Sequence, residues 1–369
     1  PNVTLTQSSL FGNLSGKDLY TYAYADSGTF VQPARDNWWG SSDPAVIAQR
    51  IYDQRNSGSS PRVDWCHYLD APPPGGILAE DVHCPDVIVC DSSVTWDLTD
   101  KPYQIVTDVW VCPGKTLTVG PGVEAWMAKT TPQPDFLVEG ILEVNGTATS
   151  PVLFRSDDDT PQPQDWIGLA FRGSSEGYLN HMEITHADSG IDVAGSATLA
   201  LESVTARDNR YGLYVYGSGP PTVGVAGSTF TGNSYYGVYL RGTPNPDVTI
   251  TRSSLFGNLG SKDLYTYSYA NAATSIVWAT DNWWGTTDPA AIDARIQDHS
   301  NSSSSPHVYY RAFGDECDYA IGRDVDRDGL PDFQDNCPKQ SNGAQHDSDG
   351  DGMGDSVSYT HLRAHETLI

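Results

Sequence analysis

The sequence predicts an all-β solenoid, in which short strands stack coil upon coil, and two repeats of different length carry that prediction. The longer repeat relates 3–24 (VTLTQSSLFGNLSGKDLYTYAY) to 248–269 (VTITRSSLFGNLGSKDLYTYSY), with 17 of 22 positions identical at an offset of 245. The shorter repeat aligns GIDV, GLYV, GVYL and DLYT at spacings of 22, 25 and 26 residues, starting at Gly190, Gly212, Gly237 and Asp263. Coils of roughly 20–30 residues with Asn and Gly corners are typical of solenoids.

Within each short segment the side chains alternate, which favours strands over helices. Val, Ile, Thr and Tyr recur with a period of two, whereas a helical solenoid needs a period of about 3.6. Successive side chains of a strand point to opposite faces. One set is therefore expected to stack inward: Ile191, Leu213, Val238 and Leu264, then Val193, Val215, Leu240 and Thr266. The alternate set is expected to point outward: Asp192, Tyr214, Tyr239 and Tyr265.

The longer repeat also predicts the domain organisation. Its register continues without a gap through DNWWG at 36–40 and 281–285. We therefore interpret 1–65 as the C-terminal end of a truncated unit and 94–310 as a complete unit, joined by a Cys- and Pro-rich linker at 66–93. The remaining 311–355 and 356–369 differ in composition from both units. Three further corner positions, Asp208, Asn233 and Asn258, recur at intervals of 25 residues inside the complete unit.

Charge and composition exclude several classes of protein. The 369 residues include 47 Asp and Glu against 21 Lys and Arg, a net charge of −26. Nucleic-acid recognition and basic membrane-surface binding both need clustered Lys and Arg, so neither is expected. A hydrophobic content of 38% with 11% aromatic residues indicates a folded core. The chain also lacks the run of about 18 apolar residues that a membrane-spanning helix requires.

The segment after each NWWG is expected to close the end of a unit. Asp288 reads as an N-cap and Pro289 as the first helical residue, with Ala and Ile following up to Asp298. This short helix and the pair Trp283 and Trp284 would cover strand edges that an open solenoid leaves exposed. A sugar-stacking platform is the alternative role for the two tryptophans.

Three segments resemble a known family. PYQIVTDVWVCPGKTLTVGPGVEAWM at 102–127, VNGTATSPVLF at 144–154 and DNWWGTTDPAAIDARI at 281–296 resemble bacterial secreted right-handed parallel β-helix proteins of the pectate-lyase-like superfamily. The resemblance covers most of 94–310 and, in shortened form, 1–65. It implies a right-handed parallel β-helix at a bacterial cell surface or outside the cell. One fold hosts many functions, so the resemblance alone assigns no chemistry.

The acidic region 311–355, with 12 Asp and Glu against 4 Lys and Arg, carries a predicted calcium loop. Alternate residues of a tight loop aim oxygens at a hard cation, and a Gly at position 6 permits the turn. Gly329 occupies that position. The candidate ligands at loop positions 1, 3, 5, 7, 9 and 12 are Asp324, Asp326, Asp328, Leu330 through its carbonyl, Asp332 and Asp335.

The wider pattern around this loop resembles thrombospondin type 3 repeats. DNCP at 335–338 is followed by Asn342, Gln345 and a second DSDGDGMGD at 347–355. The resemblance implies calcium as the cofactor and a second ion held by Asp347, Asp349, Asp351 and Asp355. Its position 12 is Ser358, which departs from the family's pattern. The tail at 356–369 resembles a translated sequencing adapter and is left out of the predicted fold.

Six cysteines favour an oxidising compartment. None forms a CxxC pair, so disulfides are a better interpretation than a zinc site. Four of them flank the linker and two bracket the first calcium loop: Cys66, Cys84, Cys90 and Cys112, and Cys317 and Cys337. Six cysteines allow 15 connectivities, so the pairing stays open. The expected location is outside the cell or at a bacterial cell surface.

The predicted outward surface is aromatic rather than acidic, and no catalytic residue is assigned. A column of Tyr214, Tyr239 and Tyr265 would bind an extended polysaccharide or cell-surface glycan, or would only stabilise the sheet by cross-strand contacts. Weaker catalytic candidates are the corner at 207–210 and the acidic triplet at 157–159. The predicted function is an extracellular structural or adhesive scaffold with a calcium-stiffened spacer. The alternative is a polysaccharide lyase or glycoside hydrolase of the β-helix type.

Overall fold

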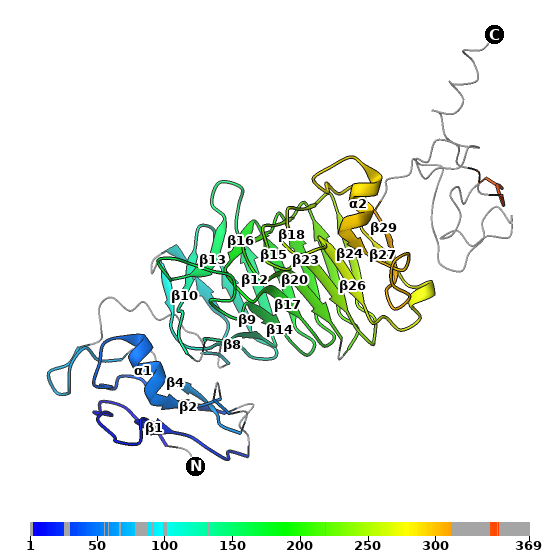
Figure 1. The fold of residues 1–369 in the computed structure, drawn as a ribbon. Coiled ribbons are helices and arrows are strands. Elements are labelled where there is room, and N and C mark those ends of the chain that lie inside the picture. The colour runs from blue at the N-terminus through cyan, green and yellow to red at the C-terminus, as the bar shows by residue number, and fades with distance from the viewer. Residues whose placement is uncertain are drawn as a thin grey trace, which may run out of the picture.

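Three parallel β-sheets run along the solenoid and enclose its core (Figure 1). They are seen in a computed structural model. The residues that the structure describes are 3–25, 30–54, 56–57, 59–65, 68–77, 88–90, 92–98, 102–131, 133–217, 219–310, 340–344 and 346. The predicted all-β solenoid is confirmed, because the strands pair in parallel from coil to coil and only two short α-helices accompany them.

Each of the first seven coils contributes one strand to each sheet, in the order I, II, III, and the last two contribute strands to sheets I and II only. Sheet I contains β5 (Ile88–Val89), β8 (Val109–Val111), β11 (Phe136–Val138), β14 (Leu169–Phe171), β17 (Ser189–Val193), β20 (Tyr211–Tyr216), β23 (Tyr236–Arg241), β26 (Leu264–Tyr267) and β28 (Ile296–Gln297). Sheet II contains β6 (Val94–Trp96), β9 (Thr116–Val119), β12 (Ile141–Asn145), β15 (Glu176–Asn180), β18 (Thr198–Glu202), β21 (Thr222–Ala226), β24 (Asp247–Thr251), β27 (Ile276–Trp278) and β29 (His307–Tyr309). Sheet III contains β7 (Tyr103–Ile105), β10 (Glu124–Met127), β13 (Val152–Ser156), β16 (Met182–Thr185), β19 (Thr205–Arg207), β22 (Thr229–Thr231) and β25 (Ser254–Phe256).

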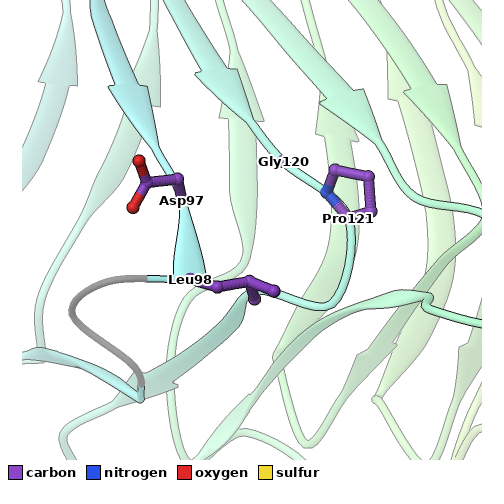
Figure 2. A pocket seen from close by; sticks show the side chains of 4 residues that line it. All are labelled: Asp97, Leu98, Gly120 and Pro121. Carbon is purple, nitrogen blue, oxygen red and sulfur yellow. The ribbon is translucent and has the colours of Figure 1, made fainter.

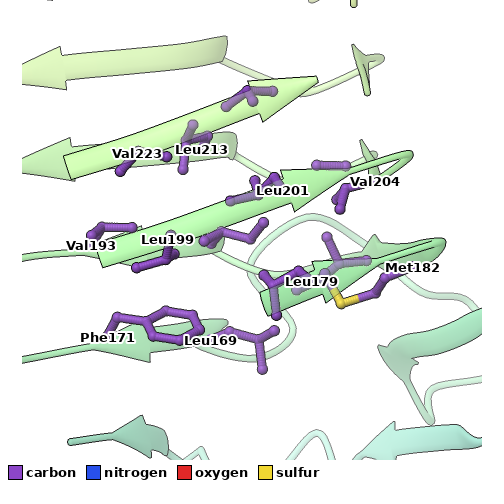
Figure 3. Packing of buried hydrophobic residues seen from close by; sticks show 14 of the residues in the cluster. Leu169, Phe171, Leu179, Met182, Val193, Leu199, Leu201, Val204, Leu213 and Val223 are labelled. Atoms are coloured by element: carbon purple, nitrogen blue, oxygen red, sulfur yellow. The ribbon is translucent and has the colours of Figure 1, made fainter. Parts of the chain in front are cut away.

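Inward-facing side chains build the core by stacking from one coil to the next. Ile191, Leu213, Val238 and Leu264 occupy neighbouring strands in register and are all fully buried, as the alternation predicts. Figure 3 shows the same layering for Leu169, Leu179, Leu199 and Leu201, whose side chains face the interior of the coils. Burying one such side chain contributes about 1.5–3 kcal/mol. No coil buries its own inner face, so the stack as a whole supplies the stability.

A column of buried asparagines fixes one corner of the coils. The Asn209 backbone N–H donates to Asn233 Oδ1 at 3.1 Å, and the Asn233 N–H donates to Asn258 Oδ1 at 3.1 Å. Asn258 in turn donates from Nδ2 to Asp263 Oδ1 at 2.7 Å. The stacked residue in the first of these coils is Asn209, not the Asp208 that the 25-residue spacing selects. Asp208 instead occupies a left-handed backbone position with φ 56°.

Each of the two repeated units ends in a cap, a short helix with the strands around it. The cap at the C-terminal end of the solenoid, here called the second cap, contains α2 (Pro289–Arg295) (Figure 1). Asp288 is the N-cap and accepts the Ala290 N–H at 3.1 Å, and proline opens the helix, as predicted. The predicted tryptophan pair behaves unequally. Trp284 is buried, whereas the Trp283 side chain is 48% exposed, so only one of the two rings seals the core. A short 3-10 helix, η2 (Ala272–Thr274), lies between β26 and β27.

The first cap repeats the second element by element at the offset of 245. It contains β1 (Leu19–Tyr20), β2 (Val31–Pro33), α1 (Pro44–Arg50), β3 (Ile51–Tyr52) and β4 (Arg62–Asp64), which correspond to β26, β27, α2, β28 and β29. The pairings also correspond, with β1 beside β3 and β2 beside β4. Each cap also contains one equivalent ion pair between its helix and the turn before its first strand, Arg50–Asp18 at 2.7 Å and Arg295–Asp263 at 2.8 Å.

Residues at both ends of the predicted linker, 66–93, take part in the folded units on either side of it. Tyr68 and Leu69 are buried with the first cap, and the Leu69 N–H donates to the Asn37 carbonyl at 2.9 Å. At the other end, β5 already belongs to the first coil. Cys90 and Cys112 form a disulfide, with Cα atoms 4.9 Å apart, that joins the first two coils. Neither helix in the described part of the chain is long and apolar enough to cross a bilayer.

Candidate functional site

The outer side of sheet I carries a surface of tyrosines that spans β20, β23 and β26. Parallel register places Tyr214 beside Tyr239, and Tyr239 beside Tyr265, with Asp192 completing the row on β17. Their inward neighbours are fully buried, and the three tyrosines are partly exposed. The structure thus brings the three predicted ligand residues together, as neighbours on one face.

Most of these rings pack against one another. Tyr214 and Tyr239 stack with ring centroids 4.7 Å apart and planes 14° apart. Tyr239 meets Tyr265 edge to face at 5.3 Å and 82°. Such aromatic pairs contribute about 0.5–1.5 kcal/mol each beyond the area they bury. The ring faces are therefore largely used within the cluster, which leaves ring edges and phenol hydroxyls for contact with a ligand.

Three further tyrosines, Tyr211, Tyr235 and Tyr236, belong to the surface and were missed from the sequence. Tyr236 stacks on Tyr265 at 4.5 Å and 6°, and Tyr211 contacts Tyr214, Tyr235 and Tyr239 at centroid distances of 5.5–5.6 Å. The signal was available, since Tyr211 and Tyr236 each stand directly before the Gly that opens an aligned segment. Tyr235 and Tyr267 are the most open rings, 46% and 42% exposed. Tyr216 stacks on Tyr214 with ring centroids 4.6 Å apart, and Tyr267 lies in the same row as Tyr216, two strands away. We call Tyr211, Tyr214, Tyr216, Tyr235, Tyr236, Tyr239, Tyr265 and Tyr267 the tyrosine face.

Two arginine–aspartate pairs border the tyrosine face. The Arg210 guanidinium lies 4.9 Å from the Tyr211 ring centroid and donates to Asp188 Oδ1 at 3.2 Å. Arg172 donates to Asp192 Oδ1 at 2.5 Å. Burial raises the pKa of Asp192 and outweighs the opposing influence of Arg172. Because both carboxylates are paired with cations, the border is close to neutral.

Two phenols at the centre of the tyrosine face, Tyr236 and Tyr239, stay protonated at physiological pH. Burial, reinforced by the neighbouring phenols, raises the pKa of Tyr236 and of Tyr239 to about 12. A protonated phenol both donates and accepts hydrogen bonds. The site therefore combines the neutral hydroxyls of Tyr236 and Tyr239 with nearby guanidinium groups, those of Arg172 and Arg210 at the border and that of Arg241, which lies in register between Tyr216 and Tyr267.

The weaker catalytic candidates are held in structural contacts. Arg207 donates to Glu183 Oε1 and to Asp208 Oδ2, both at 2.5 Å, so the corner at 207–210 is a surface ion-pair network. In the acidic triplet, Asp158 binds Lys129 Nζ at 2.7 Å. Asp157 accepts the Lys129 backbone N–H at 3.0 Å, and burial raises the pKa of the Asp157 carboxyl.

An open pocket of ≈ 560 Å³ lies elsewhere, where β6 and β9 end in the first coils (Figure 2). Asp97, Leu98, Gly120 and Pro121 line it. In Figure 2 the Asp97 carboxylate and the Leu98 side chain point to different sides of the chain, so the pocket does not gather polar groups around one point. It belongs to the edge of sheet II and is separate from the tyrosine face.

The predicted calcium ligands lie outside the described residues. Asp324, Asp326, Asp328, Leu330, Asp332 and Asp335, and likewise Asp347, Asp349, Asp351 and Asp355, stay predictions from the sequence. Within the part of the chain that the structure describes, no group of three or more His, Cys, Asp or Glu side chains is placed to hold a metal ion.

Comparison with known proteins agrees with this architecture. Residues 89–198 match the model of the pectate-lyase like beta helix domain, and 156–255 match that of the right handed beta helix region. Residues 312–345 match the thrombospondin type 3 repeat. The solenoid thus resembles the pectate-lyase-like β-helix. The type 3 match includes all six ligands predicted for the first calcium loop, whereas 347–355 lie beyond it.

One curated protein is similar over part of the solenoid-containing chain. It is "Protein bark beetle" of Drosophila melanogaster, 30% identical over 138 residues, which are 33% of this chain and 4% of that protein. The chain therefore spans only a small part of that protein's length. No solved structure matches the chain significantly. Bacterial origin and secretion stay predictions from the sequence.

Proposed function

We propose that the protein is an extracellular or cell-surface scaffold whose β-helix binds a polysaccharide at the tyrosine face. The observation that carries the proposal is the register of Tyr214, Tyr239 and Tyr265 on three successive strands. Strands in a sheet are about 4.8 Å apart, so this row repeats a hydroxyl-bearing ring at a regular short interval. An extended chain of sugars offers hydroxyl groups along its whole length and suits such a surface.

The electrostatics favour a neutral polysaccharide over an anionic one. The chain carries a net charge of −26, which repels a polyanion. The two arginines at the border of the tyrosine face are already paired with Asp188 and Asp192. Neutral phenols with a raised pKa then provide the hydrogen bonds, and the open rings of Tyr235 and Tyr267 provide apolar contact.

Binding to insoluble polysaccharides tests this proposal. Tyr214→Phe with Tyr239→Phe keeps both stacked rings and removes two hydroxyls, and we expect at least a tenfold loss of affinity for a neutral glycan. Replacing both residues by Ala should abolish retention. Tyr178→Ala is the matched control, because Tyr178 is 48% exposed on sheet II and hydrogen-bonded to Glu176. Equal retention of the wild type and both double variants would refute a ligand-binding role.

The acidic region is proposed to be a calcium-stiffened spacer that follows the solenoid. Its support is the type 3 repeat match at 312–345 and the oxygen-ligand spacing of the first loop. Adding a chelator should increase amide exchange in 311–355 and leave the solenoid strands protected. Asp326→Asn should reproduce the chelator effect at limiting calcium. If exchange in 311–355 does not respond to calcium, the spacer has another basis.

A polysaccharide lyase or glycoside hydrolase is the second candidate, supported by the match of 89–198 to the pectate-lyase like model. Release of reducing ends or unsaturated uronates from pectin, alginate and neutral glucans distinguishes the two. We expect retention of a glycan without product. Product that appears with the wild type, and disappears with the double Tyr variant, would favour the enzyme.

A further inference from the structure

Strand β4 of the first cap is buried on both of its faces, which the equivalent strand of the second cap is not. Arg62, Val63 and Asp64 are 5%, 3% and 8% exposed. At the offset of 245, His307 and Tyr309 of β29 are partly exposed and only Val308 is buried. The reason is that β4 contacts the first coils of the solenoid through Arg62 and Asp108, and Figure 1 shows the first cap beside the end of the solenoid that holds β8 and β10.

The Arg62 side chain crosses this contact, and its guanidinium pairs with groups of the first coils. Its Nη1 lies 3.0 Å from Asp108 Oδ2, and its Nη2 lies 3.7 Å from Asp135 Oδ2. The guanidinium sits over the ring of Trp110, 5.3 Å from its centroid. The side chains of Arg62 and Asp108 are only 6% and 4% exposed, so water screens this ion pair little.

Hydrogen bonds within the solenoid hold the acidic partner of Arg62 in place. Asp108 Oδ1 accepts the Asp135 backbone N–H at 2.9 Å, and the Val109 N–H donates to the Asp135 carbonyl at 2.8 Å. These bonds fix the Asp108 carboxylate and the Asp135 backbone at the rim of adjacent coils. A guanidinium matches two carboxylates because its N–H groups form a rigid fork.

Apolar residues surround the ion pair. Trp65 and Tyr68 of the first cap form one buried cluster with Val106 and Ala128 of the solenoid. All four are at most 4% exposed. A buried charge pair inside an apolar rim favours one mode of docking over others, because a wrong partner would leave the charge without its counterion.

The second cap has a different outer surface at the same positions. His307 replaces Arg62 and lies 4.6 Å from the His299 ring, centroid to centroid. Tyr309 replaces Asp64 and stacks on Trp278 at 5.2 Å and 24°. Tyr310, which replaces Trp65, donates its hydroxyl to Asp293 of α2. This cap covers its own outer edge with aromatic side chains.

We propose that the Arg62 contact is a joint that docks the cap of one β-helix unit onto the first coils of a following unit, and that the residue at this position decides whether a unit docks. Arginine recruits a following coil that offers the pair Asp108 and Asp135. Histidine, as at position 307, does not. The proposal does not depend on what the tyrosine face binds.

The distance between the two units tests the joint in the full chain. Spin labels are attached through p-acetyl-phenylalanine at Ser15 and Thr149, two exposed sites on opposite sides of the contact, so that the native cysteines are untouched. Pulsed dipolar spectroscopy should give one narrow distance distribution for the wild type. Arg62→Met and Asp108→Asn should at least double its width, and Arg62→Lys should give an intermediate width.

Two controls separate loss of the joint from loss of the fold. Arg207→Met removes an ion pair with Glu183 and Asp208 far from the contact and should keep the wild-type width. Asp135→Asn changes a side chain that is 32% exposed, and it should broaden the distribution even if Arg62→Met fails to fold. Arg62→His at neutral pH should behave like Arg62→Met. A broad wild-type distribution, or an Asp135→Asn and Arg62→Lys pair indistinguishable from wild type, would overturn the proposal.

Discussion

The two caps are repeats of one sequence pattern and have the same elements, but their inner faces have opposite surroundings. In the second cap, β26 and β27 pair with a strand on either side, and Val248 and Leu264 are 2% and 0% exposed. In the first cap, β1 and β2 each pair with one strand among the described residues. Val3, the equivalent of Val248, is 45% exposed, and Leu19 is partly exposed. One sequence template therefore supplies core in one place and surface in the other.

This difference teaches that a solenoid unit carries its local structure in its own sequence but receives its stability from its neighbours. The helices, the parallel strand pairs and the Asp–Arg pair form in both caps. What differs is the coil that lies underneath. Nearest-neighbour stacking is the main stabilising term in repeat proteins, so the same substitution should have different effects at the two copies.

The largest effect is expected for the leucine at the centre of each cap. Leu264→Ala leaves a cavity between β23 and β28 and should reduce the free energy of local unfolding by about 2–5 kcal/mol. Leu19→Ala removes a partly exposed side chain and should reduce it by about 1 kcal/mol or less. Hydrogen exchange with mass spectrometry, read on peptides of each cap, measures both. Equal losses would show that the two inner faces are equally covered.

The aspartate that ends the asparagine column should show the next largest effect. Asp263 binds both Arg295 and Asn258, so Asp263→Asn leaves the Arg295 guanidinium, whose side chain is 30% exposed, without its counterion. We expect a loss of about 1.5–3 kcal/mol, spread along the column towards Asn233. Asp18→Asn should destabilise the first cap alone, because the equivalent Asn13 is exposed. Exchange rates of the β22–β23 corner distinguish a local loss from one that spreads.

A smaller, pH-dependent difference is expected at Asp18. Burial raises the pKa of this carboxyl, but hydrogen bonds from Arg50 and Asn13 outweigh burial and hold it below the usual 3.8. The ionised carboxylate therefore stabilises the first cap above pH 3.8, and that stability is lost as the pH falls through the lower, folded-state pKa. Asp18→Asn should remove this acid sensitivity from the exchange of α1. Asp70→Asn, at an exposed carboxyl, should preserve it.

The interior of the solenoid was predictable and much of the site was not. A period of two selects Ile191, Leu213, Val238 and Leu264 as core because strand geometry leaves only two faces. The same rule places Tyr214, Tyr239 and Tyr265 in one row. It could not show that their ring faces are stacked on each other, nor that Tyr211 and Tyr236 complete the surface, because ring orientation depends on contacts between coils.

In the asparagine column, residue spacing alone does not identify which side chain stacks at the corner. A regular spacing of 25 points to Asp208, but the coil that contains it is one residue shorter, and Asn209 is the residue that stacks. Backbone hydrogen bonding decides the alignment in such a corner. A difference of one residue in coil length can be recognised only when the register of the strands on either side is known.

The sequence by itself determined the all-β solenoid, the inward and outward sets, the capping helix with its Asp288 N-cap, and the acidic spacing of 324–335 as a calcium prediction. These are properties of short segments, set by side-chain alternation, helix-end chemistry and loop geometry. Only the tertiary structure decided which cap is covered, where Arg62 finds Asp108, and how the tyrosines share their faces. Each of these depends on contacts between residues of different coils or units, which no local pattern records.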